Sequence, residues 1–133
     1  MSARNKPQMI SAINGAWVDQ PEIRSYCLSI LDHVDGSTRS YITLSMLKKA
    51  IGLAPGDAPR EFAAAVQYLL GDSAPALELK FEIVDPSGSP VPITGEEAMA
   101  ATREKINPLT GIIQENVADL ISTYLIPSKF LKG

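Results

Sequence analysis

The single histidine of the chain is the first residue whose surroundings could do chemistry. His33 lies in the run Asp32-His33-Val34-Asp35, and a histidine that is oriented by a carboxylate can act as a general base. The same run also suits a polar helix end, where a histidine interacts favourably with the helix dipole. No nucleophile or second ligand accompanies His33, so we favour the helix end and predict no catalytic residue.

Two other reactive residue types stand in patterns that do not support catalysis. Ser45 and Lys48 match the Ser-x-x-Lys spacing of some acyl-transfer enzymes, but the other motifs of those enzymes are absent. Cys27 falls on the apolar stripe of a helix and is expected to be a core residue. With one cysteine and one histidine, a zinc site would need carboxylates for its other ligands. The sequence therefore predicts a non-enzymatic protein without a cofactor or a metal.

The elements that hold these residues are mainly helices. Residues 1–18 are expected to form a flexible leader, and residues 19–133 a single domain. The first helix of this domain is predicted from Pro21 to about His33, because apolar residues recur there with helical spacing. A very short strand over 41–43 follows.

Two more helices are predicted before the first long strand. Thr43 is placed to cap the second helix, which is expected to end at Gly52. The third helix is predicted over residues 59–70, where apolar residues again share one face. Cys27 and these apolar faces together are expected to form the core.

A single β-hairpin follows the three helices. From Leu77 to Val84, apolar and charged residues alternate strictly, which predicts a strand with one face in the core. The bend over 85–90 leads to a second strand that contains Pro90 and Pro92. Because the two prolines are two residues apart, the N–H groups that they lack would have pointed to the same side of the strand. That side cannot donate hydrogen bonds to a further strand, so this strand is predicted at an edge of the sheet.

The C-terminal region is predicted to add helices. Thr94 and Glu97 form a capping box that begins one of them, and a last helix is expected at about 112–126, before Pro127. The apolar band of this last helix is wider than packing against one neighbour requires. Phe130 and Leu131 then add apolar residues to the tail.

Two interpretations of this apolar region remain open. The last helix and the tail either close the core or form an interface with a second copy or another protein. The candidate interface residues are Tyr124, Leu125, Phe130 and Leu131.

The order helix, short strand, helix, helix and hairpin resembles that of the winged helix-turn-helix superfamily. The resemblance covers residues 21–94 and implies an α+β fold, mostly helical, with residues 95–133 as a C-terminal helical extension. It also implies that the third helix occupies the position offered to a DNA major groove, and that residues 85–90 form the wing.

The charge distribution argues against DNA as the partner. The formal net charge is −3, the third helix carries Arg60 as its one basic residue, and the bend over 85–90 carries none. DNA-binding proteins usually need several phosphate contacts and side chains that read base edges. Lys48 and Lys49 form the one adjacent basic pair, so nucleic-acid contacts, if present, would fall to these two residues and Arg60.

The sequence therefore predicts a protein-interaction or regulatory subunit that binds a protein partner or forms a homodimer. A DNA-binding transcriptional regulator is the alternative, and a small enzyme or ligand sensor is a third, less favoured reading. No stretch is long enough to span a bilayer, and the N-terminus lacks an apolar run of secretory-signal length. A soluble, cytoplasmic protein is expected, and the single cysteine agrees with a reducing compartment.

Overall fold

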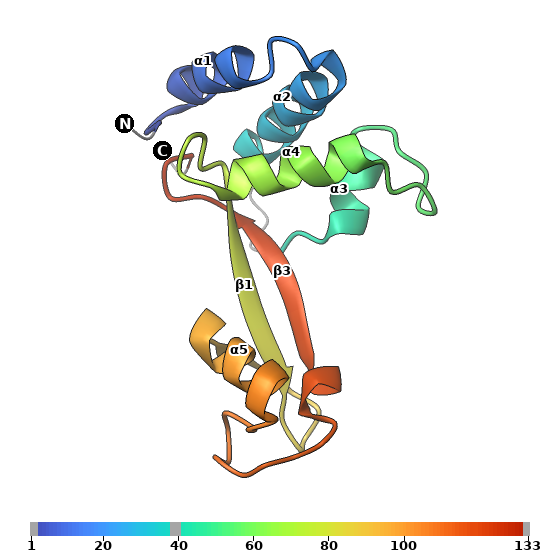
Figure 1. Cartoon of the computed structure of the whole chain (residues 1–133), viewed down its shortest axis with the longest axis vertical. Coiled ribbons are helices and arrows are strands. Elements are labelled where there is room, and N and C mark those ends of the chain that lie inside the picture. The colour runs from blue at the N-terminus through green and yellow to red at the C-terminus, as the bar shows by residue number, and fades with distance from the viewer. Residues whose placement is uncertain (1–2, 38–40, 132–133) are drawn as a thin grey trace. The chain divides into compact units, whose positions relative to one another are not determined.

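The computed structural model describes residues 3–37 and 41–131 and shows an α+β fold in which helices predominate, as predicted (Figure 1). The chain divides into two compact units. Unit 1 comprises Met1–Glu78 and Leu125–Gly133, and unit 2 comprises Leu79–Tyr124. Residues 19–133, which the sequence presents as one domain, are thus shared between the two units.

Unit 1 begins with helix α1, Lys6–Ala16, where the sequence suggests a flexible leader. The Asn5 side chain caps this helix by accepting a hydrogen bond from the Gln8 amide at 2.9 Å. Met9 and Ile13, one turn apart, are completely buried in the core of unit 1. The leader prediction failed because two apolar residues one turn apart are a weak helical signal until the rest of the core is in place.

Three further helices of unit 1 confirm the sequence predictions. They are α2 (Pro21–Asp35), α3 (Leu44–Ala50) and α4 (Arg60–Leu70). The Thr43 hydroxyl caps α3 by accepting from the Met46 amide at 3.1 Å, as expected. α2 packs against α4, and the Cys27 thiol points at the Ala65 carbonyl with an Sγ···O distance of 3.9 Å.

The strands form a three-stranded sheet in the order β2-β1-β3. Their bounds are Leu77–Val84 for β1, Pro90–Ile93 for β2 and Ile121–Pro127 for β3. β1 and β2 are antiparallel, and β2 lies at the edge, as its prolines predicted. Asp85 shapes the turn between them, because its carboxylate accepts from the amides of Ser87 and Ser89, both at 2.9 Å.

The last helix predicted at 112–126 is wrong. The structure has a short 3-10 helix, η1 (Val117–Leu120), followed directly by β3. β-Branched and aromatic residues dominate β3 and favour a strand once a partner strand is available. Ile112 and Ile113, which a helix would have partly buried, are 66% and 70% exposed in the preceding loop.

The strand β3 also pairs with the short strand predicted near residue 42. Ile42 and Leu125 exchange two backbone hydrogen bonds, each of 2.8 Å, as an isolated antiparallel bridge. Both residues are buried in the core of unit 1. The predicted short strand therefore exists as a single bridge residue, and its partner lies far along the chain.

Unit 2 places helix α5, Gly95–Glu104, against the sheet residues of β1 and β3. The predicted capping box is present: the Thr94 hydroxyl accepts from the Glu97 amide at 3.1 Å, and the Glu97 carboxylate accepts from the Thr94 amide at 3.0 Å. The core of this unit is small and centres on Ile83, Ala101 and Val117, all completely buried.

Candidate functional site

A groove of about 370 Å³ lies between α3 and α4 in unit 1. Its walls are apolar except for Lys48 and Gln67, and they consist of Leu44, Lys48, Ala58, Pro59, Phe62, Ala63, Val66, Gln67 and Leu70. We call this hollow the α3–α4 groove. An apolar groove with few polar groups is the usual form of a site that receives apolar side chains of a ligand or partner.

Local structure explains how the groove is held open. Phe62 and Val66 lie one turn apart on α4 and are 3% and 8% exposed, so they form a fixed floor. Leu44 is the first residue of α3, and the Thr43 cap holds it in place. Its side chain is 50% exposed, so an apolar wall of the groove faces solvent.

The edge of the groove carries the positive charge of Lys48. The Lys48 ammonium lies 6.0 Å from the centre of the Phe62 ring, within range of a cation–π interaction. Among the described residues, none forms an ion pair with Lys48, Lys49 or Arg60.

A second hollow, of about 400 Å³, lies on the other side of α4 and is more polar. Both hollows are lined by Ala63 and Gln67, so these two residues form the exposed ridge between them. Lys48 lines the α3–α4 groove and Arg60 lines the second hollow, while Lys49 lines neither. Two of the three predicted cations thus flank the ridge of α4.

Trp17 also lines the second hollow and is the one tryptophan of the chain. Its ring meets that of Tyr68 edge-on, with the centroids 5.4 Å apart. No described residue accepts a hydrogen bond from its buried indole N–H. Its fluorescence is therefore a natural probe of changes on this face of unit 1.

The residues predicted as a C-terminal interface do not form an exposed patch. Leu125 is 3% exposed and is a core residue of unit 1, so it is removed from the candidate interface. Phe130 and Leu131 are half-buried against the same core, and the Ser128 amide donates to the Ala76 carbonyl at 3.0 Å. The tail therefore folds back, which is one of the two alternatives the sequence left open. Tyr124 is half-buried and lies in unit 2.

The carboxylates beside His33 have a structural partner. The Lys6 ammonium of α1 lies 2.8 Å from a carboxylate oxygen of Asp32 and 3.3 Å from one of Asp35. The hydrogen bond to Asp32 is the largest cause of the raised pKa of Lys6. These carboxylates therefore connect α1 to α2, and His33 stands exposed at the end of α2.

Cys27 is a core residue, as the apolar stripe predicted. It is completely buried, and burial raises the pKa of its thiol to about 12. A thiol in this state carries almost no thiolate at neutral pH and is a poor nucleophile. In the part of the chain that the structure describes, no three His, Cys, Asp or Glu side chains gather where they could hold a metal ion.

The sequence contained a signal for the groove that the prediction did not use. Apart from its first two residues, α4 offers solvent only Gln67 as a strongly polar side chain, with Ala63 and Ala64 beside it. A surface helix normally presents charged residues to water. The exposure of Leu44, in contrast, depends on how α3 meets α4 and has no local signal.

Comparisons with protein-family models, curated proteins and solved structures give no match to this chain. Within residues 3–37 and 41–131, no helix has the length and apolar character needed to cross a membrane. Function must therefore be inferred from the site itself.

Proposed function

We propose that the chain is a non-enzymatic interaction or regulatory subunit, and that the α3–α4 groove of unit 1 binds an apolar segment of a partner protein. The observation that carries this proposal is the groove itself. Its floor of Phe62 and Val66 is fixed, and its Leu44 wall is half exposed. A preformed apolar surface of this kind binds with little cost in side-chain ordering.

The order of the strands supports the winged-helix likeness and suggests a different position for the wing. Ile42, which lies between α2 and α3, pairs with β3, and β3 lies beside β1, which follows α4. In this arrangement β3 is the returning strand of the wing, in place of β2. Residues 85–120 are then an insertion between the two wing strands, and α4 is the helix that a DNA-binding relative would use for recognition.

The charges indicate the chemistry of the partner. Lys48, Lys49 and Arg60 are cations without ion-pair partners among the described residues, on a chain whose net charge is −3. An amphipathic helix with apolar residues on one face and carboxylates at its border complements both the groove and these cations. We therefore propose an acidic amphipathic segment as the occupant.

A DNA-binding regulator is the second candidate, because one observation favours it. Lys48 and Arg60 flank the ridge of α4, and Gln67 on that ridge has an amide that can read an adenine edge. Two or three cations give few phosphate contacts, however, and alanines occupy the rest of the ridge. The apolar groove has no role in this second function.

The test of the proposal is a selection of displayed random peptides on the purified protein. We expect enrichment of acidic amphipathic sequences, and the affinity of labelled peptides can be measured by fluorescence anisotropy. Leu44→Asp should weaken binding about tenfold or more, because it places a carboxylate in the apolar wall. Ser29→Asp, on an exposed position of α2, is the matched control.

Two results would overturn the proposal. Enriched peptides that bind Leu44→Asp as tightly as wild type would show that the groove is not the site. Binding of mixed-sequence duplex DNA that falls steeply with salt, and that weakens in Lys48→Gln and Arg60→Gln, would replace it with the DNA-binding function. Light scattering of wild type and of Leu44→Asp shows separately whether the free protein self-associates and whether the groove is needed for this.

A further inference from the structure

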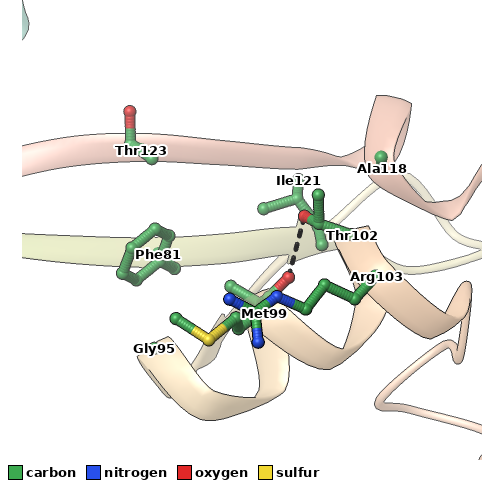
Figure 2. Close-up of a pocket in the computed structure, with 9 residues that line it drawn as sticks. Phe81, Gly95, Met99, Thr102, Arg103, Ala118, Ile121 and Thr123 are labelled. Atoms are coloured by element: carbon green, nitrogen blue, oxygen red, sulfur yellow. Dashed lines mark hydrogen bonds between the residues drawn. The ribbon is translucent and has the colours of Figure 1, made fainter.

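Unit 2 contains a pocket that the proposed function does not use. Its volume is about 380 Å³, and all of its lining residues belong to unit 2: Phe81, Gly95, Ala98, Met99, Thr102, Arg103, Ala118, Ile121 and Thr123 (Figure 2). They come from β1, α5, η1 and β3. We call this hollow the α5 pocket.

The pocket exists because small residues stand where a helix meets a sheet. Gly95 and Ala98 on α5, together with Ala118 on η1, leave space that larger side chains would fill. A β-carbon added at Gly95 would lie 3.6 Å from the Phe81 ring, so this helix start faces the aromatic wall directly. Met99 is 54% exposed and borders the opening.

The α5 pocket has one charged side chain, that of Arg103. Arg103 is the single ionisable residue among those that line the pocket, and its side chain runs back along α5 toward Met99 (Figure 2). No described residue forms an ion pair or a hydrogen bond with its guanidinium. The Thr102 hydroxyl, in contrast, is already used, because it donates to the Ala98 carbonyl at 3.0 Å (Figure 2).

These features define the class of ligand. The walls offer Phe81, Met99 and Ile121 to an apolar body, and the one charged group at the opening is a cation with five N–H donors. None of the described residues that line the pocket is a carboxylate, so no negative side chain there repels an anion. Guanidinium groups bind carboxylates through paired hydrogen bonds.

We infer that the α5 pocket binds a small amphipathic carboxylate, with its apolar chain between α5 and the sheet and its carboxylate on Arg103. The occupant is a free small molecule, because the volume lies at the lower end of the range of small-molecule sites. This site is independent of the α3–α4 groove, so either proposal can fail while the other holds.

The test compares decanoate, decanol and decylammonium, which share a chain length and differ in charge, as ligands of the ¹⁵N-labelled protein. Titrations at concentrations below micelle formation are followed by amide shifts. We expect saturable shifts at residues of α5 and β3, with decanoate bound most tightly and decylammonium least.

Two variants separate the contribution of charge from that of space. Arg103→Gln should weaken the binding of decanoate by about two- to fivefold, as expected for a solvent-exposed ion pair, and should leave the affinity for decanol nearly unchanged. Ala118→Phe fills the pocket from η1 and should abolish saturable binding of both. Arg24→Gln, which removes one arginine from unit 1, is the matched control.

Three outcomes would overturn the inference. If decanoate binds no more tightly than decanol, Arg103 does not bind the carboxylate. The same conclusion follows if Arg103→Gln leaves the affinity for decanoate unchanged. Shifts that persist in a folded Ala118→Phe protein would place the ligand elsewhere. The amide spectrum of each variant shows whether unit 2 is folded, and Ala118→Val, with a smaller side chain that also reduces the space, replaces Ala118→Phe if that variant does not fold.

Discussion

Truncation of Ile13 tests whether the packing of α1 contributes to the stability of unit 1. Ile13→Ala removes three carbons from a side chain that is completely buried. At about 0.8 kcal/mol per buried carbon, the transfer cost is about 2.4 kcal/mol, and the residual cavity raises the expected loss to about 3–4 kcal/mol. If α1 instead detaches, the loss is limited to the free energy with which α1 docks, because an isolated helix of this length is marginal in water.

Urea unfolding followed by Trp17 emission is the assay, because this residue lies at the C-terminal end of α1. Amide hydrogen exchange distinguishes the two routes: a cavity lowers protection throughout unit 1, whereas detachment lowers it in α1 alone. Val18→Ala is the control, because Val18 is 63% exposed and should change stability by less than about 0.5 kcal/mol. Equal effects of the two substitutions would refute the docking of α1 and restore the flexible leader.

Three further predictions concern single groups. Thr94→Ala removes half of the capping box and should destabilise unit 2 by about 1 kcal/mol, measured by hydrogen exchange of α5 amides. The hydrogen bond from the Ser87 hydroxyl lowers the pKa of Asp85, so this carboxyl should titrate below the ordinary aspartate range by NMR, and Ser87→Ala should raise its pKa. Cys27 should resist iodoacetamide at pH 8 in the native protein and react fully in urea.

The stability of the protein should depend on pH in opposite directions through Asp85 and through Cys27. The folded-state pKa of Asp85 lies below its unfolded value, so its contribution to stability is present above the unfolded pKa and is lost as pH falls through the folded one. Burial raises the pKa of Cys27 to about 12, so the folded state disfavours the thiolate. Stability should therefore decline as pH rises above the pKa of the unfolded thiol. Fast alkylation of native Cys27 would contradict the prediction for the thiol. Unchanged hydrogen exchange of α5 in Thr94→Ala would contradict the prediction for the capping box, and a pKa of Asp85 in the ordinary aspartate range would contradict the prediction for the turn.

Features that depend on neighbouring residues were predictable from the sequence. The Thr43 cap, the capping box at Thr94, and helices α2 and α4 all follow from short-range spacing, and each is present. The proline pattern correctly placed β2 at the edge of the sheet. In these places local preference and tertiary structure agree.

Features that depend on distant partners were not predictable. The segment of β3 has apolar residues that fit a helical face as well as a strand, and only its pairing with β1 and Ile42 decides between them. The α3–α4 groove arises from two helices that leave Leu44 uncovered, and the α5 pocket from a helix and a sheet that do not fill their interface. The weakly polar outer face of α4 is a sequence signal for the groove, but the exposure of Leu44 and the unfilled space beside α5 have no local signal.

The bridge between Ile42 and Leu125 has a consequence for the order in which the chain acquires its structure. Unit 1 consists of two separate segments of the chain. During synthesis, the bridge between Ile42 and Leu125 therefore cannot form until the second segment, Leu125–Gly133, has been made. Unit 2 is continuous and is synthesised in between. Closing the long loop between residues 42 and 125 carries an entropic cost, which falls if unit 2 has already folded and drawn its two ends together. A destabilised unit 2 should therefore slow the folding of unit 1, even where no side chain of unit 1 has changed.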